Sequence, residues 1–244
     1  MSVRGHALSG PTGSARRSWS TPLPIGRPGQ RLSTARRRWV PVRAPATVLY
    51  LSVLTGTWWT LQHTDPALAY HLVLEHSTNW HNMTRYPLRA LAVSPFWTDE
   101  SAFPWRAVGE GLLVLIPAEI LLGTRRWLLA FAAGHVGATL LTTAYIGYAV
   151  DRGLLGAQSV DVPDVGGSYG MYAVAVFAAG CCTDRRVARA AAGALFAYLL
   201  AQLLIGRTFT DWGHVAAFSI GYGLLRLTRQ ATPPTDLLVA DPAT

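Results

Sequence analysis

The chain has 244 residues, of which 50% are hydrophobic and only 14% are charged, and its formal net charge is +8. This composition is too apolar for an ordinary soluble domain. A net positive charge would indicate nucleic-acid binding in a soluble protein, but the positions of the arginines favour a membrane topology instead, so we expect no nucleic-acid partner.

The two ends of the chain differ from its middle. Residues 1–45 are rich in Arg, Ser, Pro and Gly and lack the apolar run of a signal peptide. Residues 230–244 contain three prolines, Pro233, Pro234 and Pro242. Such segments cannot bury enough apolar surface to fold, so we predict two disordered cytoplasmic tails, the first of them basic.

Between the tails lie six segments that are long, apolar and poor in charge. They span roughly 46–62, 105–122, 127–149, 166–182, 187–205 and 211–227. Each approaches the ~20 residues that a helix needs to cross ~30 Å of hydrocarbon. A spanning segment must satisfy its own backbone hydrogen bonds in lipid, which favours helices. We therefore predict an all-α, polytopic membrane domain over 46–229 with six transmembrane helices.

Charged residues predict the orientation of these helices. Arginines follow the second, fourth and sixth segments, at Arg125, Arg126, Arg185, Arg186, Arg189, Arg226 and Arg229. Most acidic residues fall in the remaining connections, 63–104, 150–165 and 206–210. By the positive-inside rule, the protein is a multi-pass cell-membrane protein with both termini in the cytoplasm. The long segment 63–104 is rich in aromatic residues, and we expect it to lie in the outer membrane interface.

Two polar residues in different spans share a predicted depth. Ser168 lies at the outer end of the fourth segment, and His214 lies about one turn below the same surface in the sixth. A nucleophile and a base at one depth are what covalent catalysis requires. Tyr172 follows Ser168 by four residues, on the same helix face, where its ring can pack against an imidazole. The alternatives are a helix cap for Ser168 and a hydrogen-bonded core position for His214.

Glycines surround both positions. Gly166 and Gly167 precede Ser168, and Gly213 and Gly221 lie in the sixth segment. Small residues let helices approach closely in lipid, which is needed to bring a serine and a histidine together. The string around Ser168 also fits the nucleophile elbow of soluble hydrolases, but an apolar span follows it and no parallel-sheet pattern precedes it.

These motifs resemble those of the rhomboid intramembrane serine proteases. That family has Gly-x-Ser-Gly with Tyr four residues after the serine, similar to Gly166, Gly167, Ser168 and Tyr172 here. The sequence "GHVAAFSIGYG" is similar to the family's histidine span through His214, Ala217 and Gly221. Upstream motifs of the family match, in order, Pro87, Arg89, Ser94, Phe96, Glu119 and Gly123. The resemblance covers roughly 87–227 and implies a six-helix rhomboid-like bundle with a Ser168–His214 dyad.

The chain departs from the family pattern in two places. Tyr169 stands where the family has glycine after the nucleophile. The family's His-x-x-x-Asn, which supplies oxyanion donors, falls on Phe103 and Ala107 by ungapped extension from Glu119, and neither side chain can donate a hydrogen bond. Loss of one such donor typically costs about 10²–10³ in rate. Backbone amides around Ser168 and Tyr169 then have to suffice, or the chemistry is weak or absent.

Two acidic residues near the dyad have competing interpretations. Glu110 either holds water, orients His214 or pairs with Arg106 four residues earlier, and the pair is favoured. Asp211 either orients the imidazole as a third member or caps the sixth helix, and the cap is favoured.

Other ionisable residues receive structural interpretations. We expect Glu119 to pair with Arg125 or Arg126, and His135 to make one interhelical hydrogen bond in a tightly packed region. The histidines of segment 63–104 have spacings that match no metal site.

Two functions remain open at this stage. The first is an intramembrane serine protease that cleaves transmembrane substrates through Ser168 and His214, supported by Tyr172, Gly166, Gly167, Tyr169, Asp211 and Glu110. The second is a catalytically weak or inactive rhomboid-like pseudoprotease that binds transmembrane helices of clients. Either function implies the lipid bilayer and transmembrane helices as partners, and neither implies a cofactor or a metal.

Overall fold

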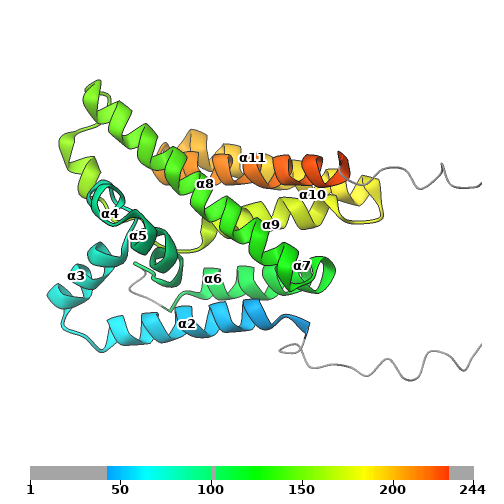
Figure 1. Ribbon diagram of the computed structural model, residues 1–244, viewed down its shortest axis with the longest axis horizontal. Helices are drawn as coiled ribbons and strands as arrows, with labels where there is room; N and C mark the ends of the chain where they lie inside the picture. Colours follow the sequence, from blue (N-terminus) through cyan, green and yellow to red (C-terminus); the bar gives the residue numbers. More distant parts are fainter. Residues whose placement is uncertain (1–42, 100–102, 231–244) are drawn as a thin grey trace, which may run out of the picture. The chain divides into compact units, whose positions relative to one another are not determined.

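The computed structural model describes residues 43–99 and 103–230, and the secondary structure in these ranges is helical, with no β-strand (Figure 1). The predicted all-α class is therefore confirmed. The predicted tails, 1–45 and 230–244, lie outside the described residues except for residues 43–45 and 230.

Six helical segments coincide with the six apolar segments. They are α2 (Pro45–Gln62), the run α6–η2–α7 (Trp105–Glu110, Gly111–Leu115 and Ile116–Leu122), α8 (Thr124–Asp151), α9 (Ser168–Gly180), α10 (Arg185–Gly206) and α11 (Phe209–Gln230). In the described part of the chain, α8 and α10 alone are long and apolar enough to cross a membrane by length and composition, and α9 is a shorter apolar helix. The number of spans stays a prediction.

Helices α8, α9 and α11 form the centre of the fold and pack against one another (Figure 1). Ala173 of α9 is fully buried between them. A Cβ at Gly134 of α8 would lie 2.2 Å from the Cβ of Ala173, and one at Gly221 of α11 would lie 2.4 Å from the Ala173 carbonyl oxygen. The three backbones therefore approach as closely as glycine allows, as expected for small residues in membrane helix packing.

The start of α2 is fixed by a buried carboxylate on α7. Glu119 is fully buried and accepts hydrogen bonds from the backbone N–H groups of Ala46 (3.1 Å) and Thr47 (2.8 Å) and from the Thr124 hydroxyl (2.8 Å). The expected ion pair of Glu119 with Arg125 or Arg126 was wrong. The first N–H groups of a helix lack intrahelical acceptors and carry partial positive charge, so they stabilise a carboxylate without any arginine.

The second helical segment is interrupted by a π-helical turn, η2. Pro117, near the start of α7, has no N–H to donate, and its ring excludes a regular α-helical contact with the preceding turn. The π turn accommodates it by adding one residue. Gly111 provides the space, since a Cβ there would lie 2.7 Å from the Leu51 side chain. One added residue rotates everything on its N-terminal side by about 100° around the helix axis.

Segment 63–104 folds into short helices in the described residues 63–99 and 103–104. These are α3 (Pro66–His76), α4 (Trp80–Arg85), α5 (Pro87–Val93) and η1 (Ser94–Phe96), and α4 also contacts η3 (Ala157–Asp161). His135 of α8 anchors them, because its Nε2 lies 3.1 Å from the Leu91 carbonyl oxygen and 3.3 Å from Ser94 Oγ. A carbonyl only accepts, so Nε2 carries the proton and His135 has the structural role expected from the sequence.

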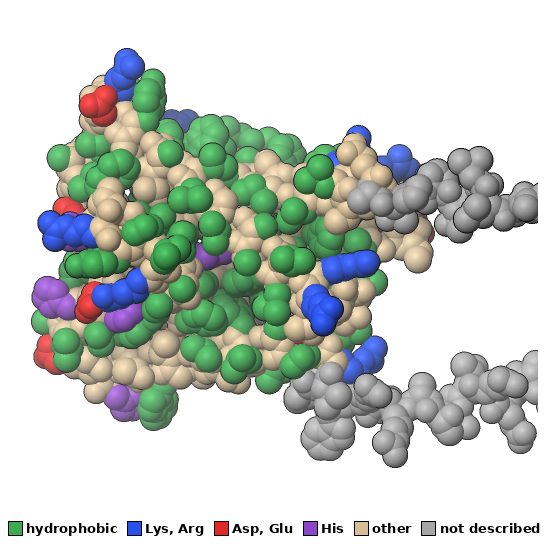
Figure 2. Space-filling model, in the orientation of Figure 1, with side chains coloured by type: hydrophobic (Ala, Val, Ile, Leu, Met, Phe, Trp, Pro, Cys, Tyr) green, Lys and Arg blue, Asp and Glu red, His purple; other side chains and the backbone are tan. Residues whose placement is uncertain are grey.

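Large apolar side chains cover much of the helical surface (Figure 2). Strongly exposed examples are Leu113, Leu129, Leu204 and Ile205. In Figure 2, arginines lie at both ends of the molecule, whereas acidic residues and histidines gather at the end opposite to the one where α2 begins and α11 ends. Such an apolar surface is unfavourable in water and suits a lipid environment.

Candidate active site

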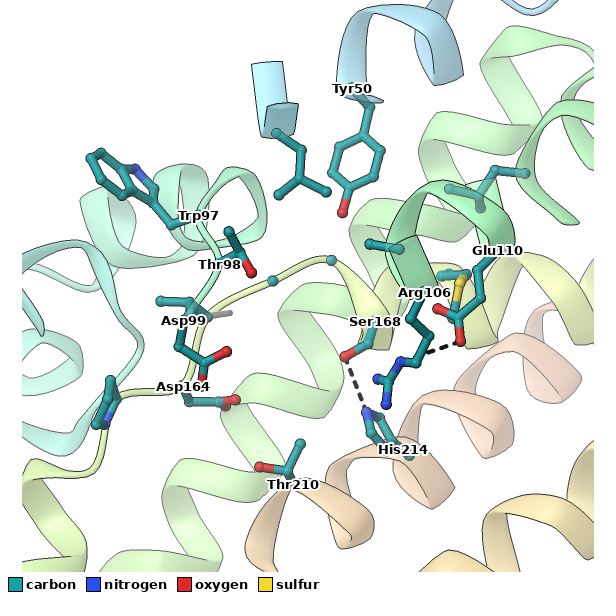
Figure 3. A pocket seen from close by; sticks show the side chains of 18 residues that line it. Tyr50, Trp97, Thr98, Asp99, Arg106, Glu110, Asp164, Ser168, Thr210 and His214 are labelled. Carbon is teal, nitrogen blue, oxygen red and sulfur yellow. Dashed lines mark hydrogen bonds and ion pairs between the residues drawn. The ribbon is translucent and has the colours of Figure 1, made fainter. Parts of the chain in front are cut away.

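A cavity of about 190 Å³ lies where the start of α9 meets α2, α6 and α11 (Figure 3). Its polar lining includes Thr98, Asp99, Arg106, Glu110, Asp164, Ser168, Thr210 and His214. The apolar lining includes Leu54, Leu115 and Met171. A cavity with convergent polar groups inside an apolar fold is the usual form of a binding or active site.

Ser168 and His214 meet in this cavity. Ser168 Oγ lies 3.0 Å from His214 Nε2, which is hydrogen-bond distance, although the two residues come from different helices (Figure 3). His214 is buried, and no hydrogen-bond partner of its Nδ1 is present among the described residues. A nucleophile and base within about 2.6–3.2 Å meet the geometric requirement for proton transfer.

The two glycines before Ser168 shape the turn into α9. Gly166 has a φ of +103°, where side chains are rarely accommodated, and its N–H donates to the Ser94 carbonyl at 2.9 Å. A Cβ at Gly167 would lie 2.3 Å from the Tyr50 hydroxyl oxygen. Ser168 is thereby the first residue of α9, where the free N–H groups of the first turn form the positive end of the helix.

Two tyrosine rings hold the imidazole of His214. The Tyr172 ring lies 4.7 Å from it, edge to face at 73°, and the Tyr169 ring lies 5.5 Å from it at 72°. Edge-to-face packing fixes ring orientation. Tyr169 does not separate Ser168 from His214. Its ring occupies the space left by Gly213, where a Cβ would lie 2.4 Å from Tyr169 ring atoms.

Asp164 supports Tyr169 from the preceding loop. The Tyr169 hydroxyl donates to Asp164 Oδ2 at 3.1 Å, and the Asp164 carbonyl oxygen accepts from the Thr78 N–H at 2.8 Å. Burial raises the pKa of the Asp164 carboxyl from 3.8 to about 6, although hydrogen bonds from Tyr169 and Thr78 oppose this shift. Asp164 was not predicted as a site residue, because no sequence spacing links a loop aspartate to the ring that it supports.

This raised pKa predicts a pH-dependent stability. The folded protein binds a proton at Asp164 more tightly than the unfolded chain does, so its free energy of unfolding should fall as pH rises from about 4 to 6 and then level off. We expect a contribution of about 1–2 kcal/mol, allowing for the partial exposure of the group. Thermal unfolding of detergent-solubilised wild type and Asp164→Asn across this range measures it.

The Asp164→Asn variant should lose this component of the pH dependence, because an amide does not titrate. Asp161→Asn, at an exposed aspartate of the same loop, is the matched control and should retain it. Identical pH profiles for wild type and Asp164→Asn would contradict the assignment.

Asp211 caps α11. Its Oδ2 accepts hydrogen bonds from the N–H (2.9 Å) and hydroxyl (2.7 Å) of Thr208, and its own N–H donates to Thr208 Oγ1 at 3.2 Å. This reciprocal arrangement is a capping box. The carboxylate hydrogen-bonds to Thr208, so the cap favoured from the sequence is the arrangement observed.

Glu110 and Arg106 form an ion pair at the cavity, as favoured from the sequence. Arg106 Nε lies 3.6 Å from Glu110 Oε1, and the Arg106 guanidinium points toward Ser168 and His214 (Figure 3). Phe103 is not a lining residue. Its ring packs against Trp58 at 4.8 Å, whereas Ala107 does line the cavity but has no donor. The sequence pattern did not predict that the Arg106 guanidinium points toward Ser168 and His214.

Metal ligation was not predicted, and no cluster of three or more metal-ligating side chains occurs in residues 43–99 and 103–230.

The described residues form an all-helical fold, with two helices long and apolar enough to cross a membrane and a serine–histidine pair at the N-terminal end of a buried helix. Comparison with protein families matches residues 40–233 to the family described as rhomboid-like protein. The chain belongs to this family, as the motifs around Ser168 and His214 predicted. No curated protein and no solved structure matches the chain.

Proposed function

We propose that this protein is an intramembrane serine protease that cleaves transmembrane substrates near their outer ends. The observation that carries the proposal is the 3.0 Å contact between Ser168 Oγ and His214 Nε2 at the N-terminus of α9. As Ser168 Oγ bonds to the substrate carbonyl carbon, His214 Nε2 accepts the proton of the Ser168 hydroxyl. His214 then donates that proton to the leaving amine as the peptide bond breaks, which leaves an acyl ester on Ser168.

Hydrolysis of the ester requires water, and the cavity is suited to admit it. Thr98, Asp99 and Glu110 line it beside the dyad and supply hydrogen-bonding groups that an apolar pocket lacks. A water molecule that loses a proton to His214 attacks the ester carbonyl, and Ser168 recovers its proton when the acyl bond breaks. No cofactor enters this sequence.

The topology is part of the proposal. A six-span membrane domain over 46–229, between cytoplasmic tails, places the cavity toward the outer face of the membrane. The acidic residues that gather at the end opposite to the start of α2 support this orientation (Figure 2). Substrates in this arrangement are transmembrane helices that reach Ser168 through the bilayer.

Active-site labelling tests the proposal. A fluorophosphonate probe should label wild-type protein in detergent, and intact-mass and peptide analysis should place the adduct on Ser168. Ser168→Ala should not be labelled. Ser219→Ala is the matched control, because Ser219 lies on α11, does not line the cavity and donates a hydrogen bond to the Val215 carbonyl, and it should be labelled like wild type. Labelling that persists in Ser168→Ala would refute the assignment.

A second candidate function is a pseudoprotease that binds client transmembrane helices without cleaving them. It is favoured by Phe103 and Ala107, which provide no oxyanion donor. For this function, clients should co-purify equally with wild type and Ser168→Ala, and neither protein should be labelled or cleave a transmembrane reporter.

A further inference from the structure

We infer that Arg106 is the side-chain oxyanion donor of this site, an inference that rests on the proposed protease function. Arg106 lies on α6, one turn before Glu110, and lines the same cavity as Ser168 and His214. Its guanidinium points toward that pair (Figure 3). Of the described lining residues, Arg106 alone carries a permanent positive charge.

The ion pair leaves the terminal amino groups of Arg106 available. It is made through Nε, and at 3.6 Å it is longer than a normal hydrogen bond. Guanidinium has five N–H donors in a plane, so a contact at Nε does not consume those of the two terminal nitrogens. The side chain is 59% exposed, and Glu110 holds it from one side without burying it.

The π turn explains why an arginine occupies this position. Counted back from Glu119 without a gap, Ala107 takes the place of the family's oxyanion-donating asparagine. The residue added in Gly111–Leu115 rotates α6 by about 100°, the angle between neighbouring residues on a helix. The direction expected for Ala107 is therefore taken by the preceding residue, Arg106. The two positions without donors, Phe103 and Ala107, thus reflect a shift of helical register and not the loss of every side-chain donor.

Attack of Ser168 on a peptide carbonyl requires a hydrogen-bond donor beside the carbonyl oxygen. When Ser168 Oγ bonds to the carbonyl carbon, the π electrons of the carbonyl move to its oxygen, which becomes an oxyanion. The guanidinium of Arg106 and the first-turn N–H groups of α9 donate to that oxygen, and the electrons return when the amine leaves. Arginine keeps its proton throughout, so its charge is constant while that of His214 alternates.

Arg106→Gln removes the charge and should lower kcat for a transmembrane reporter by about 10²–10³ while KM changes less than about threefold. The rate of Ser168 labelling by a fluorophosphonate should fall in parallel, because the phosphoryl oxygen takes the oxyanion position. Arg106→Lys keeps a point charge and should recover about tenfold of the loss. Arg89→Gln is the matched control, because it breaks an arginine–glutamate pair away from the cavity, with Glu75 at 2.6 Å, and should behave as wild type.

The outcomes separate the two proposals. If wild type is not labelled at Ser168, the protease function itself fails. If wild type and Arg106→Gln are labelled at the same rate, the inference about Arg106 fails and the protease function stands. The same holds if Arg106→Gln raises KM and leaves kcat unchanged, because Arg106 would then bind a substrate carboxylate. If Arg106→Gln unfolds at a lower temperature than Arg89→Gln, its loss of activity could come from misfolding, and Arg106→Lys is the variant to compare. A kcat of Arg106→Lys equal to that of wild type would overturn the inference.

Discussion

Ser168→Ala is expected to reduce cleavage of a transmembrane reporter below detection, and His214→Ala to reduce it comparably. Loss of the nucleophile or base of a serine protease lowers kcat by as much as about 10⁶ when the groups act as a unit. Here the unit is the pair Ser168–His214, because His214 Nδ1 has no hydrogen-bond partner in the described part of the chain. The rings of Tyr169 and Tyr172 orient the imidazole instead. Gel-based cleavage in detergent and in liposomes measures the effect.

The double variant Ser168→Ala/His214→Ala distinguishes a dyad from two independent residues. If Oγ and Nε2 act together, removal of the second partner costs nothing further, so the double variant should equal either single variant. Additive losses, measured in an assay sensitive enough to record the residual cleavage by each single variant, would contradict a dyad.

Matched substitutions elsewhere test whether the losses are specific. Ser219→Ala removes a serine from α11 without touching the cavity, and His63→Ala removes an exposed histidine whose Nδ1 hydrogen-bonds to the Trp59 carbonyl. Both should cleave like wild type. Retention of cleavage in Ser168→Ala would leave the pseudoprotease or another nucleophile as the explanation.

Much of the helical framework could be predicted from the sequence because the length of apolar segments reflects a strong physical constraint, the cost of polar groups in lipid. The pairing of Ser168 with His214 was predicted for the same reason, since topology assigns each residue a depth. Depth is a one-dimensional quantity, however, and the rotation of each helix about its axis depends on packing.

The residues that sequence reasoning misplaced depend on such rotations and on contacts between distant segments. Glu119 was expected to bind an arginine because the sequence shows its neighbours, but two of its three hydrogen-bond donors are N–H groups more than 70 residues away. Arg106 points toward the dyad from α6, which is separated from Glu119 by a π turn that a simple count of residues does not show. The role of Asp164 depends on the orientation of the Tyr169 ring, which is set by the missing Cβ of Gly213.

The contact between α9 and α11 leads to the second large expected effect, from Gly221→Val. A Cβ at Gly221 would lie 2.4 Å from the Ala173 carbonyl oxygen and 2.7 Å from Ala173 Cα. Both are backbone atoms, so no side-chain movement relieves the overlap and the helices must separate. Overpacking of this kind costs about 1–3 kcal/mol or more. We therefore expect a lower unfolding temperature and the loss of most cleavage.

Cleavage should be lost because Gly221 lies two turns along α11 from His214, and Ala173 lies five residues along α9 from Ser168. Separation at this contact is transmitted to the dyad, where a displacement of about 1 Å is enough to cost on the order of 10² in rate. Gly223→Val on the same helix is the matched control, because a Cβ there meets nothing within 4 Å. Cleavage and fluorophosphonate labelling of Ser168 should fall together in Gly221→Val and remain in Gly223→Val. Equal activity of the two variants would show that the α9–α11 contact does not position the dyad.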